Sequence, residues 1–296
     1  MEKKFTSLKT AVIDLGSNSV RLMIVGQAYS KQSVVTRLGE GLSFTGRLSQ
    51  ESMDRTLKVV LFFINEAKDA GAEDIHIFGT QAMRAAQNAE AFRRVIFEAS
   101  GINVEVLDGQ TEALCGFLGA ASNLPQNINT AVIDIGGAST EITIGVPPKE
   151  ILYSKSVPIG TVALRDLHLD DKLKFDDLIS SSLDIYGKID AQNYVGIGGA
   201  FCSLAAMVLG LKEYDAKVVD NSVITMEDIA AVFDKIWQKS EEEILSFYPF
   251  LGARARVIKF GALWVKELMR HFNIQKIYVS EKDNLEGYCI LKNIKL

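Results

Sequence analysis

Two stretches of the chain repeat the same pattern of apolar and polar positions, 120 residues apart. Residues 11–24 read AVIDLGSNSVRLMI and residues 131–144 read AVIDIGGASTEITI, with seven of fourteen positions identical. In each copy an apolar, β-branched run ends in Asp-x-Gly, small residues follow, and a second run leaves. Apolar runs of this kind are typical of buried strands, and small residues between them of a tight turn. The pattern predicts a duplicated β-hairpin.

The rest of the chain alternates between helical and strand patterns, which indicates an α/β fold. Ser49 is spaced as the N-cap of a helix that stops at Gly71, and Thr225 and Asp228 as a capping box. We expect further helices over 82–99, from Gln110, and near 200–210, 226–238 and 257–272. We expect further strands at 75–77, 102–107, 151–157, 193–197 and 276–280.

Length and repeat spacing together predict two domains. A chain of 296 residues suits two domains, and a single repeat at this spacing suits a duplicated domain rather than a solenoid. The polar stretch 122–130 precedes the second copy. We therefore predict a first domain over 1–125 and a second over 126–296.

Composition excludes several classes of protein. The net charge of -5 argues against a surface that wraps nucleic acid by charge. No apolar run approaches the ~18 residues of a membrane span, and no signal peptide precedes the first strand, so we expect a cytoplasmic protein with no membrane partner. Three dispersed cysteines predict buried thiols rather than disulfides or a zinc site.

The hairpin tips carry the chemistry. Tips of Gly, Ser and Thr expose consecutive backbone N–H groups and hydroxyls, which bind phosphate oxygens. Asp14 and Asp134 stand in register beside the two tips, and a carboxylate there can hold Mg²⁺. Two such units suit the binding and charge neutralisation that phosphoryl transfer needs. The alternative is a pair of tight hairpins in which each Asp caps its turn.

Seven motifs in order carry a family resemblance: DLGSNSVRL (14–22), RLGEGL (37–42), FGTQAMRAAQN (78–88), DGQTEALCGFLGA (108–120), VIDIGGASTE (132–141), VPIGTVALRD (157–166) and GIGGAFCSLAA (196–206). Together they resemble the exopolyphosphatase / guanosine pentaphosphate phosphatase family, in its short two-domain form. That family belongs to the actin, heat-shock-chaperone and sugar-kinase superfamily. The resemblance therefore implies two duplicated ribonuclease-H-like (actin-like ATPase) domains with an interdomain cleft.

The resemblance also implies roles for single residues. Glu112 would be the general base that activates water; the alternative is a surface glutamate in a first helical turn. The implied Mg²⁺ ligands are Asp14, Asp134 and Glu141, with an exposed strand residue as the alternative for Glu141. The implied phosphate-binding residues are Ser17, Asn18, Ser19, Arg21, Arg84, Gly136, Gly137, Ala138, Ser139 and Thr140. For the arginines the alternative is a solvated side chain.

The expected reaction is hydrolysis of the terminal phosphate of polyphosphate or of the 5′-γ-phosphate of guanosine pentaphosphate. The chain departs from the family pattern at Thr111, Ala138, Ala200 and Leu285, where relatives usually have Glu, Gly, Thr and Arg. These departures keep open a non-catalytic alarmone or polyphosphate sensor. The superfamily keeps open an ATP-dependent kinase or ATPase. A homodimer is expected from the resemblance alone.

Overall fold

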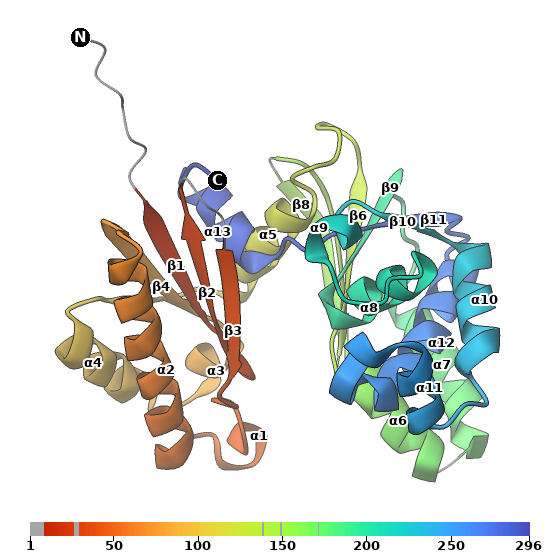
Figure 1. Cartoon of the computed structure of the whole chain (residues 1–296), viewed down its shortest axis with the longest axis horizontal. Helices are drawn as coiled ribbons and strands as arrows, with labels where there is room; N and C mark the ends of the chain where they lie inside the picture. The colour runs from red at the N-terminus through yellow and green to blue at the C-terminus, as the bar shows by residue number, and fades with distance from the viewer. Residues whose placement is uncertain (1–8, 27–29, 138, 149, 171) are drawn as a thin grey trace. The chain divides into compact units, whose positions relative to one another are not determined.

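The computed structural model describes residues 9–26, 30–137, 139–148, 150–170 and 172–296 (Figure 1). The chain forms two compact units. The first contains the chain up to Gly116 together with Asn284–Leu296, and the second is Phe117–Asp283. This division differs from the predicted single boundary between residues 125 and 126, because the chain leaves the first unit within a helix and its last helix returns there. The interdomain cleft stays a prediction.

The first unit has a five-stranded sheet in the described residues, in the order β3-β2-β1-β4-β5. All six residues of β1 are buried, which is typical of a central strand covered on both faces. The strands are β1 (Thr10–Leu15), β2 (Ser19–Val25), β3 (Ser30–Val35), β4 (Asp74–Gly79) and β5 (Val104–Val106). The helices are α1 (Leu42–Thr45), α2 (Gln50–Asp69), α3 (Gln81–Ala85), α4 (Ala89–Ser100) and α13 (Asn284–Leu291), together with the part of α5 (Gly109–Ala120) that ends at Gly116.

The second unit has a six-stranded sheet in the described residues, in the order β10-β11-β9-β6-β7-β8. The strands are β6 (Thr130–Ile135), β7 (Thr140–Val146), β8 (Glu150–Val157), β9 (Asn193–Ile197), β10 (Val223–Thr225) and β11 (Lys276–Val279). The helices are α6 (Thr161–Asp170), α7 (Lys172–Tyr186), α8 (Gly198–Val208), α9 (Ala216–Val219), α10 (Met226–Ile236), α11 (Glu241–Phe247) and α12 (Ala255–His271), with a 3-10 helix at Pro249–Arg254.

The two sheets share one topology. In the first, β2 is antiparallel to both of its neighbours, while β1, β4 and β5 are parallel. The strands β8-β7-β6-β9-β11 repeat this order and these directions, and β10 adds an antiparallel edge strand. The α/β fold of two duplicated units that the repeats predict is therefore confirmed.

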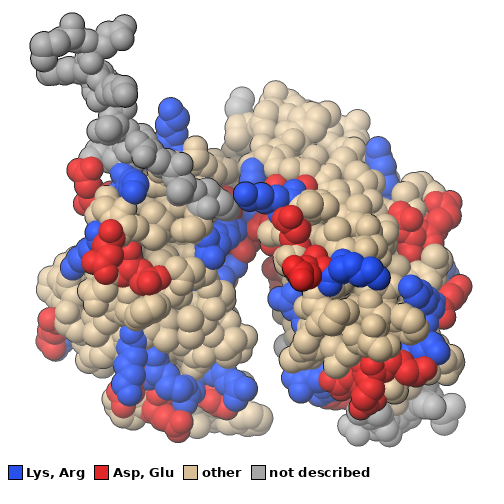
Figure 2. Space-filling model, viewed as in Figure 1, with Lys and Arg blue, Asp and Glu red and all other residues tan. Residues whose placement is uncertain are grey.

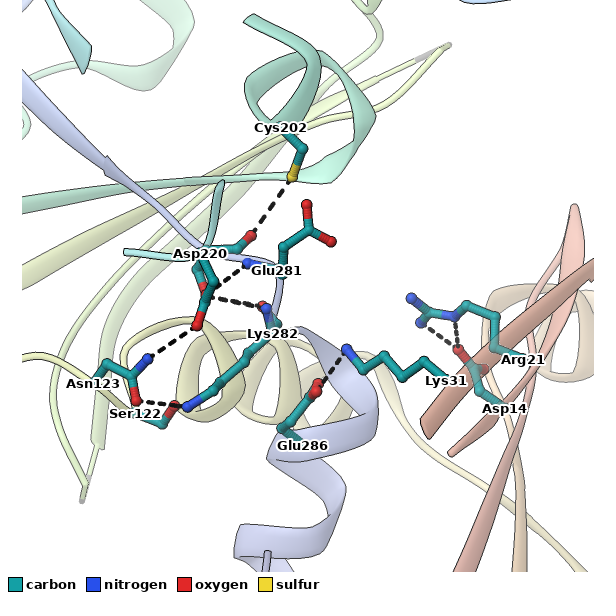
Figure 3. A network of polar contacts seen from close by, with 11 residues as sticks. Asp14, Arg21, Lys31, Ser122, Asn123, Cys202, Asp220, Glu281, Lys282 and Glu286 are labelled. Carbon is teal, nitrogen blue, oxygen red and sulfur yellow. Dashed lines mark hydrogen bonds and ion pairs between the residues drawn. The ribbon is translucent and has the colours of Figure 1, made fainter. Parts of the chain in front are cut away.

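The last helix, α13, is tightly integrated into the first unit. Leu285, Tyr288 and Cys289 are buried with residues of β1, β2 and α5. Gly287 lies so close to α5 that a β-carbon there would collide with the carbonyl oxygen of Cys115. The fully buried Glu286 carboxylate forms an ion pair with Lys31 Nζ of β3, at 2.6 Å (Figure 3). Only glycine permits this approach of the two helices.

The helix predicted over 82–99 is broken into α3 and α4. Ala86 is extended, with ψ 129°, and two tertiary interactions hold the break. Gln87 N–H donates to the Gly46 carbonyl. The Asn88 side chain accepts from the Leu48 N–H at 2.9 Å and donates to the Leu48 carbonyl at 3.0 Å. Backbone bonds to a distant segment thus override the local helical pattern.

The cysteine prediction is confirmed: Cys115, Cys202 and Cys289 are buried and unbridged. Burial raises the pKa of Cys115 and of Cys289 to about 12, so both stay protonated at neutral pH. Within the part of the chain that the structure describes, no helix has the length and apolar character needed to cross a bilayer.

We expect Gly287→Ala to lower the free energy of unfolding by about 3 kcal/mol, because the new methyl group has no room against the α5 backbone. The matched control is Gly109→Ala, where a β-carbon would meet nothing within 4 Å, and which we expect to change stability by no more than about 1 kcal/mol. Urea unfolding followed by circular dichroism measures both. Equal midpoints for the two variants would contradict this packing.

Candidate functional site

The two hairpin tips are built by the same backbone interaction. Gly16 N–H donates to the Ser19 carbonyl at 3.0 Å, and Gly136 N–H donates to the Ser139 carbonyl at 3.0 Å. A β-carbon at Gly16 would lie 2.8 Å from the Ser19 oxygen, so glycine is required for this turn. The tips lie between the first two strands of each sheet, β1 and β2 or β6 and β7.

A segment after the third strand of each unit supports the tip. After β3, the Arg37 N–H donates to the Asn18 carbonyl at 2.8 Å and the Gly39 N–H to the Ser17 carbonyl at 2.8 Å. After β8, the Thr161 and Val162 N–H groups donate to the carbonyls of Gly136 and Gly137. The motifs RLGEGL and VPIGTVALRD, which begin 120 residues apart, thus both donate backbone hydrogen bonds to the tip of their own unit.

In the first unit the predicted metal ligand Asp14 is paired with the predicted phosphate ligand Arg21. The two residues are opposite each other on β1 and β2. Arg21 Nε donates to Asp14 Oδ2 at 2.9 Å, and Nη2 binds the same oxygen (Figure 3). Asp14 is 2% exposed, whereas the Arg21 side chain is 27% exposed. The buried carboxylate therefore orients the arginine, and the arginine reaches the surface.

In the second unit the corresponding pair is Asp134 and Glu141, opposite each other on β6 and β7. Glu141 accepts a hydrogen bond from Ser156 Oγ of β8 at 2.5 Å. Asp134 lies against the turn after β9, where a β-carbon at Gly198 would be 2.7 Å from Asp134 Oδ1. Gly198 has φ +86°, so it provides both the turn and the space.

These two carboxylates offer oxygen donors of the kind that Mg²⁺ prefers. Among the described residues, no group of three or more His, Cys, Asp or Glu side chains converges as a metal cage. A site with few protein carboxylates is in keeping with Mg²⁺, which keeps several waters and also binds substrate phosphates.

The predicted base Glu112 lies in the first turn of α5 and contacts Arg84 of α3. Arg84 Nη1 donates to Glu112 Oε2 at 2.5 Å and to the Leu107 carbonyl at 2.7 Å. About a quarter of each side chain is exposed. The structure thus brings together a carboxylate and an arginine that are 28 residues apart in sequence.

Asp108 fixes the start of this helix. The Thr111 N–H donates to Asp108 Oδ1 at 2.7 Å. The backbone and hydroxyl hydrogen bonds from Thr111 lower the pKa of the Asp108 carboxyl below its usual range. Thr111 therefore contributes to the cap of the helix that carries Glu112.

Thr140, expected at the second tip as a phosphate ligand, has a buried hydroxyl. Thr140 is fully buried: its hydroxyl donates to the Ile159 carbonyl at 2.6 Å and accepts from Trp264 Nε1 at 2.8 Å. Both of these bonds join the hydroxyl to other residues of the second unit. Ala138 lies outside the described residues. Leu285 is buried in the small core around α13.

The other predicted tip residues stay accessible. Asn18 and Gly137 are exposed, and Ser17, Ser19, Gly136 and Ser139 are half-buried. The Ser17 hydroxyl donates to Gln81 Oε1 at 2.9 Å, which places the start of α3 beside the first tip.

Sequence reasoning missed Arg254, at the end of the 3-10 helix. Its guanidinium covers the turn after β9, with atoms 3.1–3.2 Å from where a β-carbon at Gly199 would lie. Its Nη1 also reaches Ser203 Oγ at 3.5 Å. Arg254 is 55 residues from Gly199 in the chain, and no local pattern signals this approach.

Comparisons with known proteins agree with this architecture. The model of the Ppx/GppA phosphatase family matches residues 20–292. The crystal structure of an Aquifex aeolicus Ppx/GppA phosphatase, type II variant, is similar with a TM-score of 0.86 and 28% identity, covering 98% of this chain and all of that one.

Two curated relatives cover nearly all of this chain. Exopolyphosphatase 2 of Mycobacterium tuberculosis is 28% identical over 95% of this chain and 98% of its own length. The guanosine-5'-triphosphate,3'-diphosphate pyrophosphatase of Aliivibrio fischeri is 28% identical over 94% of this chain. The match spans 58% of that longer protein.

We expect Thr111→Ala to raise the pKa of Asp108 toward its usual value, since the variant removes the hydroxyl bond that favours the ionised carboxylate. Carboxyl ¹³C shifts followed through an acid titration measure this pKa. Thr45→Ala, which leaves Asp108 untouched, is the control. An unchanged Asp108 titration in Thr111→Ala would show that the hydroxyl does not bind this carboxylate.

Proposed function

Because the chain belongs to the Ppx/GppA phosphatase family, we propose that it hydrolyses the terminal phosphate of inorganic polyphosphate or the 5′-γ-phosphate of guanosine pentaphosphate. The observation that carries this proposal is the duplicated tip with its two register pairs. One unit offers Asp14–Arg21, whose cation suits phosphate, and the other offers Asp134–Glu141, whose oxygens suit a metal. Relatives named for both substrates support it.

Glu112 is the proposed general base. A water molecule attacks the terminal phosphorus, its proton passes to a Glu112 carboxylate oxygen, and the bond from phosphorus to the bridging oxygen breaks. The products are orthophosphate and a substrate that is one phosphate shorter. The Asp108 cap at the helix start and the Arg84 contact support the position of Glu112, as a base must lie within hydrogen-bond reach of the water.

The proposed phosphate ligands are backbone N–H groups, hydroxyls and arginines. Arg84 uses Nη1 for both of its protein bonds, and an arginine carries five N–H donors, which leaves others for phosphate oxygens. Arg21, oriented by Asp14, is the second cation. The tip donors are Ser17, Asn18, Ser19, Gly136, Gly137 and Ser139. Such donors stabilise charge that develops in the transition state.

We propose that Mg²⁺ binds at Asp134 and Glu141. The fit rests on their adjacent positions on β6 and β7 and on the space that Gly198 leaves beside Asp134. When bound, the ion neutralises charge on the phosphate oxygens. Asp14, the third expected ligand, is proposed instead to orient Arg21, because its Oδ2 accepts two bonds from that arginine.

We expect wild-type protein to release orthophosphate from polyphosphate or guanosine pentaphosphate in Mg²⁺, and Glu112→Gln to lower kcat by about 10² to 10⁴-fold, since the amide cannot accept the proton. Phosphate release from polyphosphates of several lengths and from guanosine pentaphosphate, with and without Mg²⁺, measures this. Glu98→Gln, an exposed glutamate of α4, is the matched control.

Two results would count against these assignments. If Glu112→Gln releases phosphate as fast as Glu98→Gln, another group is the base. If wild-type protein binds these substrates and releases no phosphate in Mg²⁺, the chain is a sensor rather than an enzyme.

A further inference from the structure

The first unit contains an open cavity of about 1020 Å³ next to the first tip. Its walls are the segment that follows β3 and the first turn of α2, and they include Arg37, Glu40, Arg47, Glu51 and Arg55. Figure 2 shows basic side chains, with acidic ones among them, over the end of the first unit that carries α1. The roles proposed so far for the tips, Glu112 and Mg²⁺ do not use this cavity.

The charges that line the cavity do not cancel. Arg55 binds both glutamates, with Nη1 2.7 Å from Glu51 Oε1 and Nη2 3.1 Å from Glu40 Oε2. Arg37 and Arg47 are exposed, and their guanidinium groups form no ion pair with any described residue. Three arginines against two glutamates leave a net positive wall, on which Arg37 and Arg47 carry the uncompensated charge.

The backbone at Arg37 favours a role for its side chain. Arg37 has φ 51°, in the left-handed region that non-glycine residues seldom adopt. Its N–H and that of Thr36 both donate to the Asn18 carbonyl, so the strained residue is tied to the tip. A glycine would adopt this conformation more easily. Strain retained at such a position is a reason to assign a function to the side chain.

The segment that lines the cavity is joined to the phosphate tip by backbone hydrogen bonds. Gly39 N–H donates to the Ser17 carbonyl, and a β-carbon at Gly39 would lie 3.2 Å from Ser17 Cβ. Arg47 follows at the other end of the same segment, and the Asn88 side chain fixes its neighbour Leu48 through two hydrogen bonds. A phosphate chain bound at Ser17–Ser19 therefore has two accessible arginines along the adjoining wall.

We propose that this cavity is a distal subsite that binds internal phosphates of a polyphosphate chain through Arg37 and Arg47. The inference rests on the proposed function, because it assumes that the substrate is a phosphate polymer. Arginine suits this ligand, since its planar fork bonds two phosphate oxygens at once. Arg55 is a positioning residue: it also donates from Nε to the Thr36 carbonyl at 3.1 Å and so fixes the segment that carries Arg37.

The test is equilibrium binding in EDTA, without turnover, of long-chain polyphosphate, tripolyphosphate and guanosine pentaphosphate. We expect Arg37→Gln/Arg47→Gln to bind long-chain polyphosphate about tenfold more weakly, with less dependence on salt, and to bind tripolyphosphate as wild type does. Arg37→Gln and Arg47→Gln are also measured singly, and Arg94→Gln, which removes one charge from an exposed arginine of α4, is the charge-matched control for each of them. Arg37→Gly removes the guanidinium, so it should weaken the binding of long-chain polyphosphate. Because it also relieves the backbone strain, the melting temperature should not fall.

Each outcome decides the question. Equal affinities of wild-type and double-variant protein for long-chain polyphosphate would overturn the subsite. An equal loss for tripolyphosphate would place the arginines at the terminal phosphate, and a loss confined to guanosine pentaphosphate would make them nucleotide ligands; either result overturns it too. Because binding is measured without hydrolysis, a protein that binds as expected but releases no phosphate would refute only the proposed function.

Discussion

The approach of α13 to α5 is the constraint on which the first unit depends. Gly287 lies directly against the backbone of Cys115, three residues beyond the proposed base Glu112. The neighbouring Glu286 is fully buried and paired with Lys31 of β3. Loss of one partner from a buried ion pair of this kind strongly destabilises a protein, because the other charge is left buried without it. The last helix of the chain therefore holds both the edge of the first sheet and the helix that positions the proposed base.

The duplication explains how one small motif can carry the two chemistries that we propose. Both units form the same hairpin with the same Gly-to-Ser backbone bond and the same Asp at the end of the first strand. They differ at the residue opposite that Asp, which is Arg21 in one and Glu141 in the other. An arginine neutralises the first Asp and presents a cation, whereas a glutamate adds a second carboxylate. This one difference in a shared scaffold is what assigns the proposed phosphate binding to the first unit and the proposed metal binding to the second.

Whether a feature could be predicted from the sequence depends on how far apart in the chain its interacting residues are. The hairpins and the Thr225–Asp228 capping box, whose two bonds are both present, depend on residues a few positions apart. The strand β3 was missed because SKQSVV is almost wholly exposed and lacks an apolar alternation. The break between α3 and α4, the buried Thr140 hydroxyl and the approach of Arg254 to Gly199 depend on partners 19 to 124 residues away. No local sequence pattern predicts these three features.

Phosphate release in ¹⁸O-labelled water tests the central claim, which is attack of water on the terminal phosphorus. Wild-type protein would be incubated with unlabelled polyphosphate and Mg²⁺, and the products separated by mass. The account predicts a single ¹⁸O atom in each released orthophosphate and none in the shortened chain, because the bond to the bridging oxygen breaks on the side of the terminal phosphorus. Label in the shortened chain would contradict it. Transfer of the terminal phosphate to an added acceptor such as a nucleoside diphosphate, with no orthophosphate released, would also contradict it.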